Sequence, residues 1–122
     1  MYSVIVDGRE IPLRYTMREL ADMEEAIGTM DGFRDLIVKG KKRLRNMATA
    51  IRIMGNGALA HEGKPADLTD DWLLDHMNPH ALTDYQLAVL GAFTDVWAME
   101  TSNEKVRDLT LEEIEAKKEP GN

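Results

Sequence analysis

The chain has 122 residues, a hydrophobic share of 43%, no cysteine and a formal net charge of -7. This length predicts one domain that buries a single core, and the lack of cysteine excludes disulfide frameworks, zinc fingers and thiol nucleophiles. No basic segment followed by an apolar run opens the chain, and no window approaches 18 consecutive apolar residues. We therefore expect neither secretion nor membrane spanning, and the lack of cysteine fits an intracellular protein.

The first predicted element is a β-hairpin over residues 2–15. Asp7 and Gly8 separate two short runs in which apolar and polar residues alternate, and the second residue of such a pair tolerates the positive φ of a tight turn. Pro12 cannot donate to a ladder, so its strand is expected at an edge or with that position facing outward. The apolar set of the alternation comprises Val4, Val6, Ile11, Leu13 and Tyr15.

Two helices are predicted next. Thr16 and Glu19 have the spacing of a capping box, which predicts a helix over 17–27. Asp31 is expected to cap a second, short helix over 32–38, and Gly40 to end it.

A longer helix is predicted over 41–59. Apolar residues recur there at steps of three and four, in the order Leu44, Met47, Ile51, Met54 and Ala58. This seam continues through Gly55 and Gly57, so we expect the helix to reach Leu59. The alternative is a helix that stops at Gly55, because each interior glycine costs about 1 kcal/mol.

The remaining predicted elements follow a surface loop over 61–67. Thr69 is expected to cap a helix over 69–77, and Thr83 with Gln86 to form a second capping box for a helix over 84–101. The apolar face of that last helix comprises Tyr85, Val89, Ala92, Phe93, Val96 and Trp97. Residues 103–122 are expected to form a charged, flexible tail. The predicted fold is α+β and mostly α, with the hairpin packed on four to five helices in a single domain over 1–102.

Charge is distributed unevenly along the chain. The window from Leu36 to His61 contains no acid, whereas Glu62 to Asn122 contains fourteen acids and five basic residues. Cations in a first helical turn oppose the helix macrodipole, so local stability does not explain the basic run at the start of helix 41–59. The candidate partner-binding residues are Lys39, Lys41, Lys42, Arg43, Arg45 and Arg52.

Three interpretations of this basic stretch remain: a solvated helix face, a nucleic-acid site, or a docking surface for an acidic protein. The stretch has no interleaved aromatic residues to stack on bases, and the rest of the chain is acidic. Nucleic acid is therefore disfavoured, and we favour a protein partner.

Metal binding and catalysis find little support in the sequence. His76 and His80 are four residues apart, but Pro79 between them breaks the helix that would place them on one face. The close carboxylate pairs fall where helix N-termini favour negative charge, and neither serine lies in a nucleophile-elbow pattern. We expect no enzyme, no metal and no cofactor.

The order of these features resembles the phage tail assembly chaperone family. The resemblance begins with the central "DG" of the hairpin, "LRYTMREL" and "ELADMEEAIG". It continues through "ALAHEGKPADLTDDWLLDHM" and "LTDYQLAVLGAFTDVW", and so covers residues 4–101. The turn chemistry and the capping box assign Asp7, Gly8, Thr16 and Glu19 structural roles in the hairpin and cap.

The resemblance implies a protein made during phage or prophage expression in the host cytoplasm. Such a protein binds the tape-measure protein, helps tail-tube subunits polymerise around it and has no catalytic residues. Two alternatives stay open: a minor structural tail protein of the virion, and a small nucleic-acid-associated regulator that uses residues 39–52. Homo-oligomerisation also stays open.

Overall fold

The computed structural model describes the backbone of residues 2–100 and the side chains of residues 2–94. Two strands and five α-helices are joined by two short 3-10 turns, so the predicted α+β, mostly α fold is confirmed. In chain order the elements are β1 Ser3–Val6, β2 Arg9–Pro12, α1 Met17–Ala26, η1 Met30–Gly32, α2 Phe33–Val38, α3 Arg43–His61, α4 Asp70–His76, η2 Pro79–Ala81 and α5 Leu82–Glu100.

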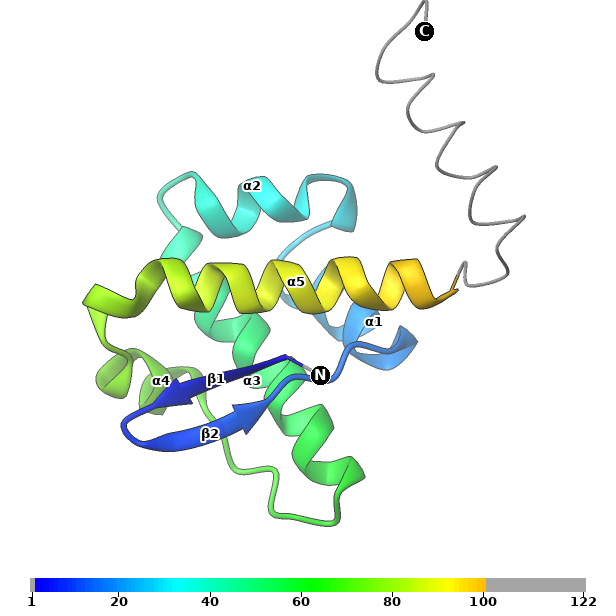
Figure 1. Ribbon diagram of the computed structural model, residues 1–122. Coiled ribbons are helices and arrows are strands. Elements are labelled where there is room, and N and C mark those ends of the chain that lie inside the picture. The colour runs from blue at the N-terminus through cyan, green and yellow to red at the C-terminus, as the bar shows by residue number, and fades with distance from the viewer. Residues whose placement is uncertain (1, 101–122) are drawn as a thin grey trace, which may run out of the picture.

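Helix α3 is the central element of the arrangement. It contacts α1, α2, α4, α5 and strand β2, while α5 contacts β1, α2 and η2 (Figure 1). The hairpin thus lies against two long helices that are distant from it in sequence. All but one of the buried apolar residues of the described part form one cluster, to which the hairpin, the loop before α4 and all five helices contribute.

The β-hairpin has the predicted tight turn. Asp7 and Gly8 take the left-handed φ values of 52° and 79°, as a type I′ turn requires at both central positions. Alternation then points one set of side chains at the core: Val4, Val6, Ile11, Leu13 and Tyr15 are all buried, as predicted.

Pro12 lies opposite Ser3 at the open end of the hairpin. The Val6–Arg9 pair next to the turn is the hydrogen-bonded kind, and the two kinds of pair alternate along an antiparallel ladder. Ser3–Pro12 is therefore a non-hydrogen-bonded pair, and the missing N-H of Pro12 costs no ladder bond. The prediction of an outward-facing position for Pro12 is consistent with this register.

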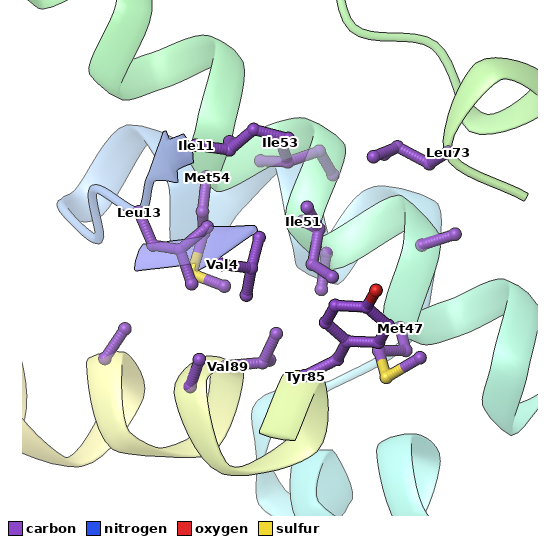
Figure 2. Packing of buried hydrophobic residues seen from close by; sticks show 14 of the residues in the cluster. Val4, Ile11, Leu13, Met47, Ile51, Ile53, Met54, Leu73, Tyr85 and Val89 are labelled. Carbon is purple, nitrogen blue, oxygen red and sulfur yellow. The ribbon is translucent and has the colours of Figure 1, made fainter. Parts of the chain in front are cut away.

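The hairpin is stabilised by packing on the helices. Figure 2 shows Val4, Ile11 and Leu13 of the hairpin region meeting Met54 of α3 and Val89 of α5 in one apolar layer. Two isolated strands are marginal in water, so this layer accounts for the stability of the hairpin.

The capping box at the start of α1 is present as predicted. Oε1 of Glu19 accepts the backbone N-H of Thr16 at 2.6 Å and the Thr16 hydroxyl at 2.5 Å. Glu19 is only 2% exposed, although it is charged. Its partners therefore come mainly from the turn that it caps, with Arg14 Nε 4.0 Å away.

Helix α3 continues through "GNG" to His61, so the alternative that it stops at Gly55 is wrong. A Cβ on Gly55 would lie 2.6 Å from Leu68 Cδ1 and 2.7 Å from Ile11 Cγ2, and a Cβ on Gly57 would lie 2.5 Å from Glu19 Oε2. The glycines therefore let the hairpin, the loop before α4 and α1 approach the helix closely.

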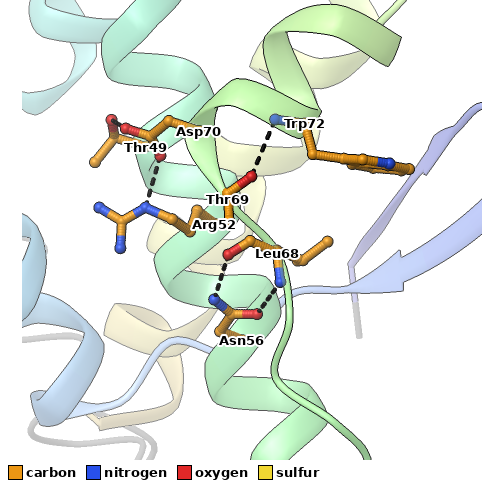
Figure 3. Close-up of polar contacts among 7 residues, drawn as sticks. All are labelled: Thr49, Arg52, Asn56, Leu68, Thr69, Asp70 and Trp72. Atoms are coloured by element: carbon orange, nitrogen blue, oxygen red, sulfur yellow. Dashed lines mark hydrogen bonds and ion pairs between the residues drawn. The ribbon is translucent and has the colours of Figure 1, made fainter.

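Asn56, between these two glycines, fixes the loop before α4. Its side chain donates to the carbonyl of Leu68 and accepts the N-H of Leu68, both at 3.0 Å (Figure 3). Leu68 is buried, so Asn56 supplies the bonds that its backbone would otherwise lack.

Helix α4 has the cap that the sequence predicts, whereas α5 does not. The Thr69 hydroxyl accepts the N-H of Trp72 at 3.0 Å. The predicted Thr83–Gln86 capping box is wrong, because α5 begins at Leu82 and includes both residues. The reason lies upstream: Asn78 accepts the N-H of His80 at 3.0 Å and starts η2, which leads directly into α5.

Two other predicted helix starts also need correction. Asp31 lies inside η1, and the cap position of α2 is Gly32, which makes no side-chain cap bond. The basic helix begins at Arg43, two residues later than predicted, because Gly40 takes a φ of 84° and turns the chain. The side chains of Val96 and Trp97, and the predicted tail over 103–122, lie outside the described residues.

Candidate functional site

Five of the six predicted binding residues gather where α2 passes into α3. Lys39, Lys41 and Lys42 surround the turn at Gly40 and line an open hollow of about 420 Å³. Its other walls are Ile27, Asp35, Leu36 and Asn46. Arg43 and Arg45 follow in the first turn of α3. We call this group the basic corner, defined as Lys39, Lys41, Lys42, Arg43 and Arg45.

Arg52, the sixth predicted residue, has a structural role. Its Nε lies 2.6 Å from Oδ1 of Asp70, and the Thr49 hydroxyl donates to Oδ2 of the same carboxylate at 2.8 Å (Figure 3). Asp70 stands in the first turn of α4. Arg52 therefore ties α3 to α4, and it does not join the basic corner.

The charges of the basic corner are nearly all unpaired within the described part of the chain. Lys39 lies 3.8 Å from Asp35, but both side chains are largely exposed and such pairs contribute little. Among the side chains of residues 2–94, no carboxylate comes within ion-pair distance of the other four. Since these cations also oppose the macrodipole of α3, the fold itself does not explain them.

An apolar cavity lies beside Leu44, which stands between two residues of the basic corner along α3. It has a volume of about 170 Å³ and lies between the starts of α3 and α5 and the helix α4. Leu44, which stands between Arg43 and Arg45, lines it and is 44% exposed. Its other apolar walls are Met47, Leu74, Met77, Leu82 and Tyr85.

Sequence reasoning missed this cavity. Leu44 belongs to the same apolar seam as Met47 and Ile51, which are buried, so periodicity alone assigns it to the core. Apart from Met47, the other walls come from α4, the turn that follows it and the start of α5, more than 25 residues later in the chain. Only the tertiary packing brings these segments to the basic corner.

A larger, polar hollow of about 600 Å³ lies between α1 and α3. Its charged walls are of mixed sign and comprise Arg18, Glu19, Asp22, Glu25 and Arg52. Glu19 and Arg52 are already engaged by Thr16 and Asp70. These two groups are therefore committed to the fold, and the hollow offers a weaker candidate than the basic corner.

Tyr15 is a buried titratable group whose role is structural. Its ring packs against Phe93 with a centroid distance of 5.3 Å. Burial, assisted by the negative charge of Glu24, raises the pKa of Tyr15 to about 12. The hydroxyl therefore stays protonated through the neutral range and contributes no charge to a site.

The predicted hairpin and cap residues also act structurally. Asp7 and Gly8 form the turn, while Thr16 and Glu19 bond to each other. At the start of β2, next to the turn, Arg9 binds Asp67 at 2.8 Å and lies 5.6 Å from the ring of Trp72. That hydrogen bond from Arg9 lowers the pKa of Asp67.

The histidines do not assemble a metal site in the described region. Nδ1 of His76 lies 2.7 Å from the carbonyl oxygen of Trp72, and the two rings stack at 4.5 Å. Within the described residues, no group of three His, Cys, Asp or Glu side chains is arranged to hold a metal ion. Over the same part of the chain, none of the helices has the length and apolar character to cross a membrane.

Comparison with known proteins gives no assignment: no protein-family model, curated protein or solved structure matches the chain significantly.

Proposed function

We propose that the chain is a binding protein that acts as a phage or prophage tail assembly chaperone. In this role it binds the tape-measure protein in the host cytoplasm and assists polymerisation of tail-tube subunits. The proposal takes its identity from the sequence resemblance over residues 4–101. The structural observation that supports a binding role is the basic corner. Four of its five cations have no carboxylate partner in the described part, and the exposed Leu44 stands among them along the chain.

Protein interfaces commonly combine an apolar centre with a polar or charged rim. Leu44 and the cavity beside it have the apolar character of a centre, and Arg43 and Arg45 flank Leu44 along the helix. Positive charge speeds encounter with acidic partners and selects against basic ones. A chaperone that shields apolar segments of a long partner until assembly needs a surface of this kind. The proposed role involves no catalytic residue and no cofactor.

Co-expression with the neighbouring genes tests the proposal. The full-length chain should capture a tape-measure protein, recognised as a very long helical protein encoded downstream. The triple variant Lys41→Glu, Lys42→Glu and Arg43→Glu should lose most of this capture. A matched control reverses Arg18 and Lys64, two exposed cations away from the basic corner. If the wild-type chain captures neither the tape-measure protein nor the tail-tube protein, the proposal is overturned.

A nucleic-acid-associated regulator is the alternative that the basic corner keeps open. Retention of duplex DNA that weakens steeply with salt would favour it, because phosphate contacts release counterions. Absence of retention at low salt would eliminate it. The other alternative, a minor structural tail protein, is tested by looking for the chain in purified virions.

A further inference from the structure

We propose that the apolar cavity beside Leu44 is the docking pocket for an acidic amphipathic helix of the partner protein. Apolar side chains of that helix enter the cavity, and its carboxylates face the basic corner. This inference rests on the proposed function only in requiring a protein partner. It adds where the partner binds and what chemistry its binding segment has.

The cavity itself selects an apolar occupant. Its volume of about 170 Å³ is close to that of the roughly 150 Å³ apolar cavities known to accept a benzene molecule. One large aliphatic or aromatic side chain therefore fits. Met47 and Met77 form part of the wall, and methionine adapts its rotamers to differently shaped neighbours.

The Tyr85 hydroxyl at the cavity wall is already bonded. The Tyr85 hydroxyl accepts the N-H of Asn78 at 3.0 Å and lies 3.5 Å from the carbonyl oxygen of Ile5, to which it donates. An occupant thus gains little by presenting its own backbone groups here. A helix suits such a wall because it satisfies its backbone hydrogen bonds internally and offers apolar side chains along one face.

The surrounding charge selects an acidic occupant. Leu44 is 44% exposed and stands between Arg43 and Arg45 in the first turn of α3, and Lys41 and Lys42 precede them along the chain. These four cations outnumber the two exposed acids that adjoin other lining residues in the sequence, Asp75 and Asp84. No carboxylate in the described part lies within 4 Å of these four cations. Carboxylates flanking the apolar face of a partner helix would supply the missing counter-charges, whereas a basic helix would be repelled.

Another exposed leucine provides a contrast. Leu87 on α5 is 62% exposed, more than Leu44, but it does not line this cavity. Single exposed apolar residues are common on protein surfaces. The combination of an exposed leucine, a cavity and unpaired cations distinguishes Leu44 and makes Leu87 a matched control.

The test is a titration of the full-length chain labelled with ¹³C at the methionine methyl groups. The probes are two synthetic helical peptides with leucines along one face, one flanked by glutamates and the other by lysines. With the glutamate peptide, the Met47 and Met77 methyl resonances should shift. Those of Met17, which is exposed on α1, and Met54, which is buried beneath the hairpin, should not. The lysine peptide should bind at least about tenfold more weakly, a difference of about 1.4 kcal/mol.

Three variants test which residues contribute to binding of the peptide. Leu44→Ser should weaken binding of the glutamate peptide by about tenfold or more, while Leu87→Ser should leave it unchanged. Reversing both arginines, Arg43→Glu with Arg45→Glu, should exchange the preference between the two peptides. Since all four residues are at least partly exposed, circular dichroism should confirm that each variant is folded.

Several results would overturn the pocket assignment: equal binding of both peptides, no shift at Met47 and Met77, equal effects of the two leucine variants, or the same shifts with duplex DNA. Tape-measure capture separates this inference from the proposed function. If Leu44→Ser captures the tape-measure protein as well as wild type does, the pocket assignment fails and the function stands. If the peptide binds as described but wild type captures no tape-measure protein, the function fails and the pocket stands.

Discussion

The two ends of α3 differ in how completely their side chains are used by the fold. Near its C-terminal end, Gly55, Asn56 and Gly57 each have a specific partner in another element. Near its N-terminal end, Leu44 is 44% exposed and the neighbouring cations lack carboxylate partners in the described part of the chain. The comparison shows which unusual sequence features have a structural explanation and which require a functional one.

The glycine pair and the basic run are both unfavourable for an isolated helix. Interior glycines cost about 1 kcal/mol each, and cations near a helix N-terminus cost a few tenths of a kcal/mol. Tertiary packing offsets the first cost, because no larger residue fits at Gly55 or Gly57 without displacement of a neighbour. Nothing in the described packing offsets the second, which is why the basic corner is the better candidate for a binding surface.

The largest expected effect on stability comes from Asn56→Ala near the C-terminal end of α3. The change leaves both the N-H and the carbonyl of the buried Leu68 without their partner. We expect a loss of about 3 kcal/mol in the free energy of unfolding, since each unsatisfied buried group costs about 1 to 3 kcal/mol. Urea denaturation measures it.

Asn46→Ala, near the N-terminal end of α3, is the matched control for this variant. Asn46 is also half-buried, but it donates a single bond, to the carbonyl of Leu36 at 3.0 Å. A loss of about 1 kcal/mol is expected there. Equal losses of unfolding free energy in the two variants would contradict the view that the fold uses the side chains at the C-terminal end of α3 more completely than those at its N-terminal end.

A rise in pH should also lower the free energy of unfolding, through the ionisation of Tyr15. Its pKa is near 10 in the unfolded chain and about 12 in the folded protein, so the unfolded state loses its proton first. The free energy of unfolding should therefore fall between pH 10 and 12, by up to about 2.7 kcal/mol from this group.

The measurement is the pH dependence of urea unfolding for wild type and for Tyr15→Phe. The phenylalanine variant removes the ionisable group but keeps the ring beside Phe93. It should show a smaller fall over this range. Parallel curves for the two proteins would indicate that Tyr15 ionises equally easily in both states.

Gly55→Ala should destabilise the protein by about 2 kcal/mol, although alanine is the better helix former. The added Cβ meets Leu68 and Ile11 at less than 3 Å, and overpacking of this kind costs about 1 to 3 kcal/mol. Gly32→Ala is the control, because a Cβ there meets no atom within 4 Å. A more stable Gly55→Ala protein would show that helix propensity outweighs the close approach.

The local parts of this fold were predictable from the sequence. The Asp7–Gly8 turn, the Thr16–Glu19 box and the Thr69 cap depend on side chains within a few residues of one another. The Thr83–Gln86 box was equally plausible locally, but the turn that begins at Asn78 starts α5 before it. A local capping pattern thus predicts a helix start correctly unless a residue upstream has already started the helix.

The candidate site was predictable only in part. The run of cations identified the basic corner, but it also included Arg52, whose partner Asp70 lies 18 residues later. Periodicity placed Leu44 in the core with Met47, although only the packing of α4 and α5 decides which of them is covered. Sequence patterns identify a helix face, whereas exposure and pairing depend on distant segments.

The smallest expected effect on stability comes from reversing the charges at the N-terminal end of α3. Lys41→Glu, Lys42→Glu and Arg43→Glu together should leave the free energy of unfolding unchanged or raise it by a few tenths of a kcal/mol per residue. The new acids would lie at the positive end of the helix macrodipole, and the cations they replace have no carboxylate partner in the described part. Urea unfolding at low salt measures this gain, which added salt should reduce.

Arg52→Glu on the same helix is the matched control for this charge reversal. It replaces the ion pair with Asp70 by a repulsion, so we expect a loss of about 1 kcal/mol where the triple variant shows none. If the triple variant also unfolds more easily, the basic corner has a structural partner, and its cations no longer indicate a binding surface. A stable triple variant that has lost its partner protein would instead mark these residues as kept for binding rather than for folding.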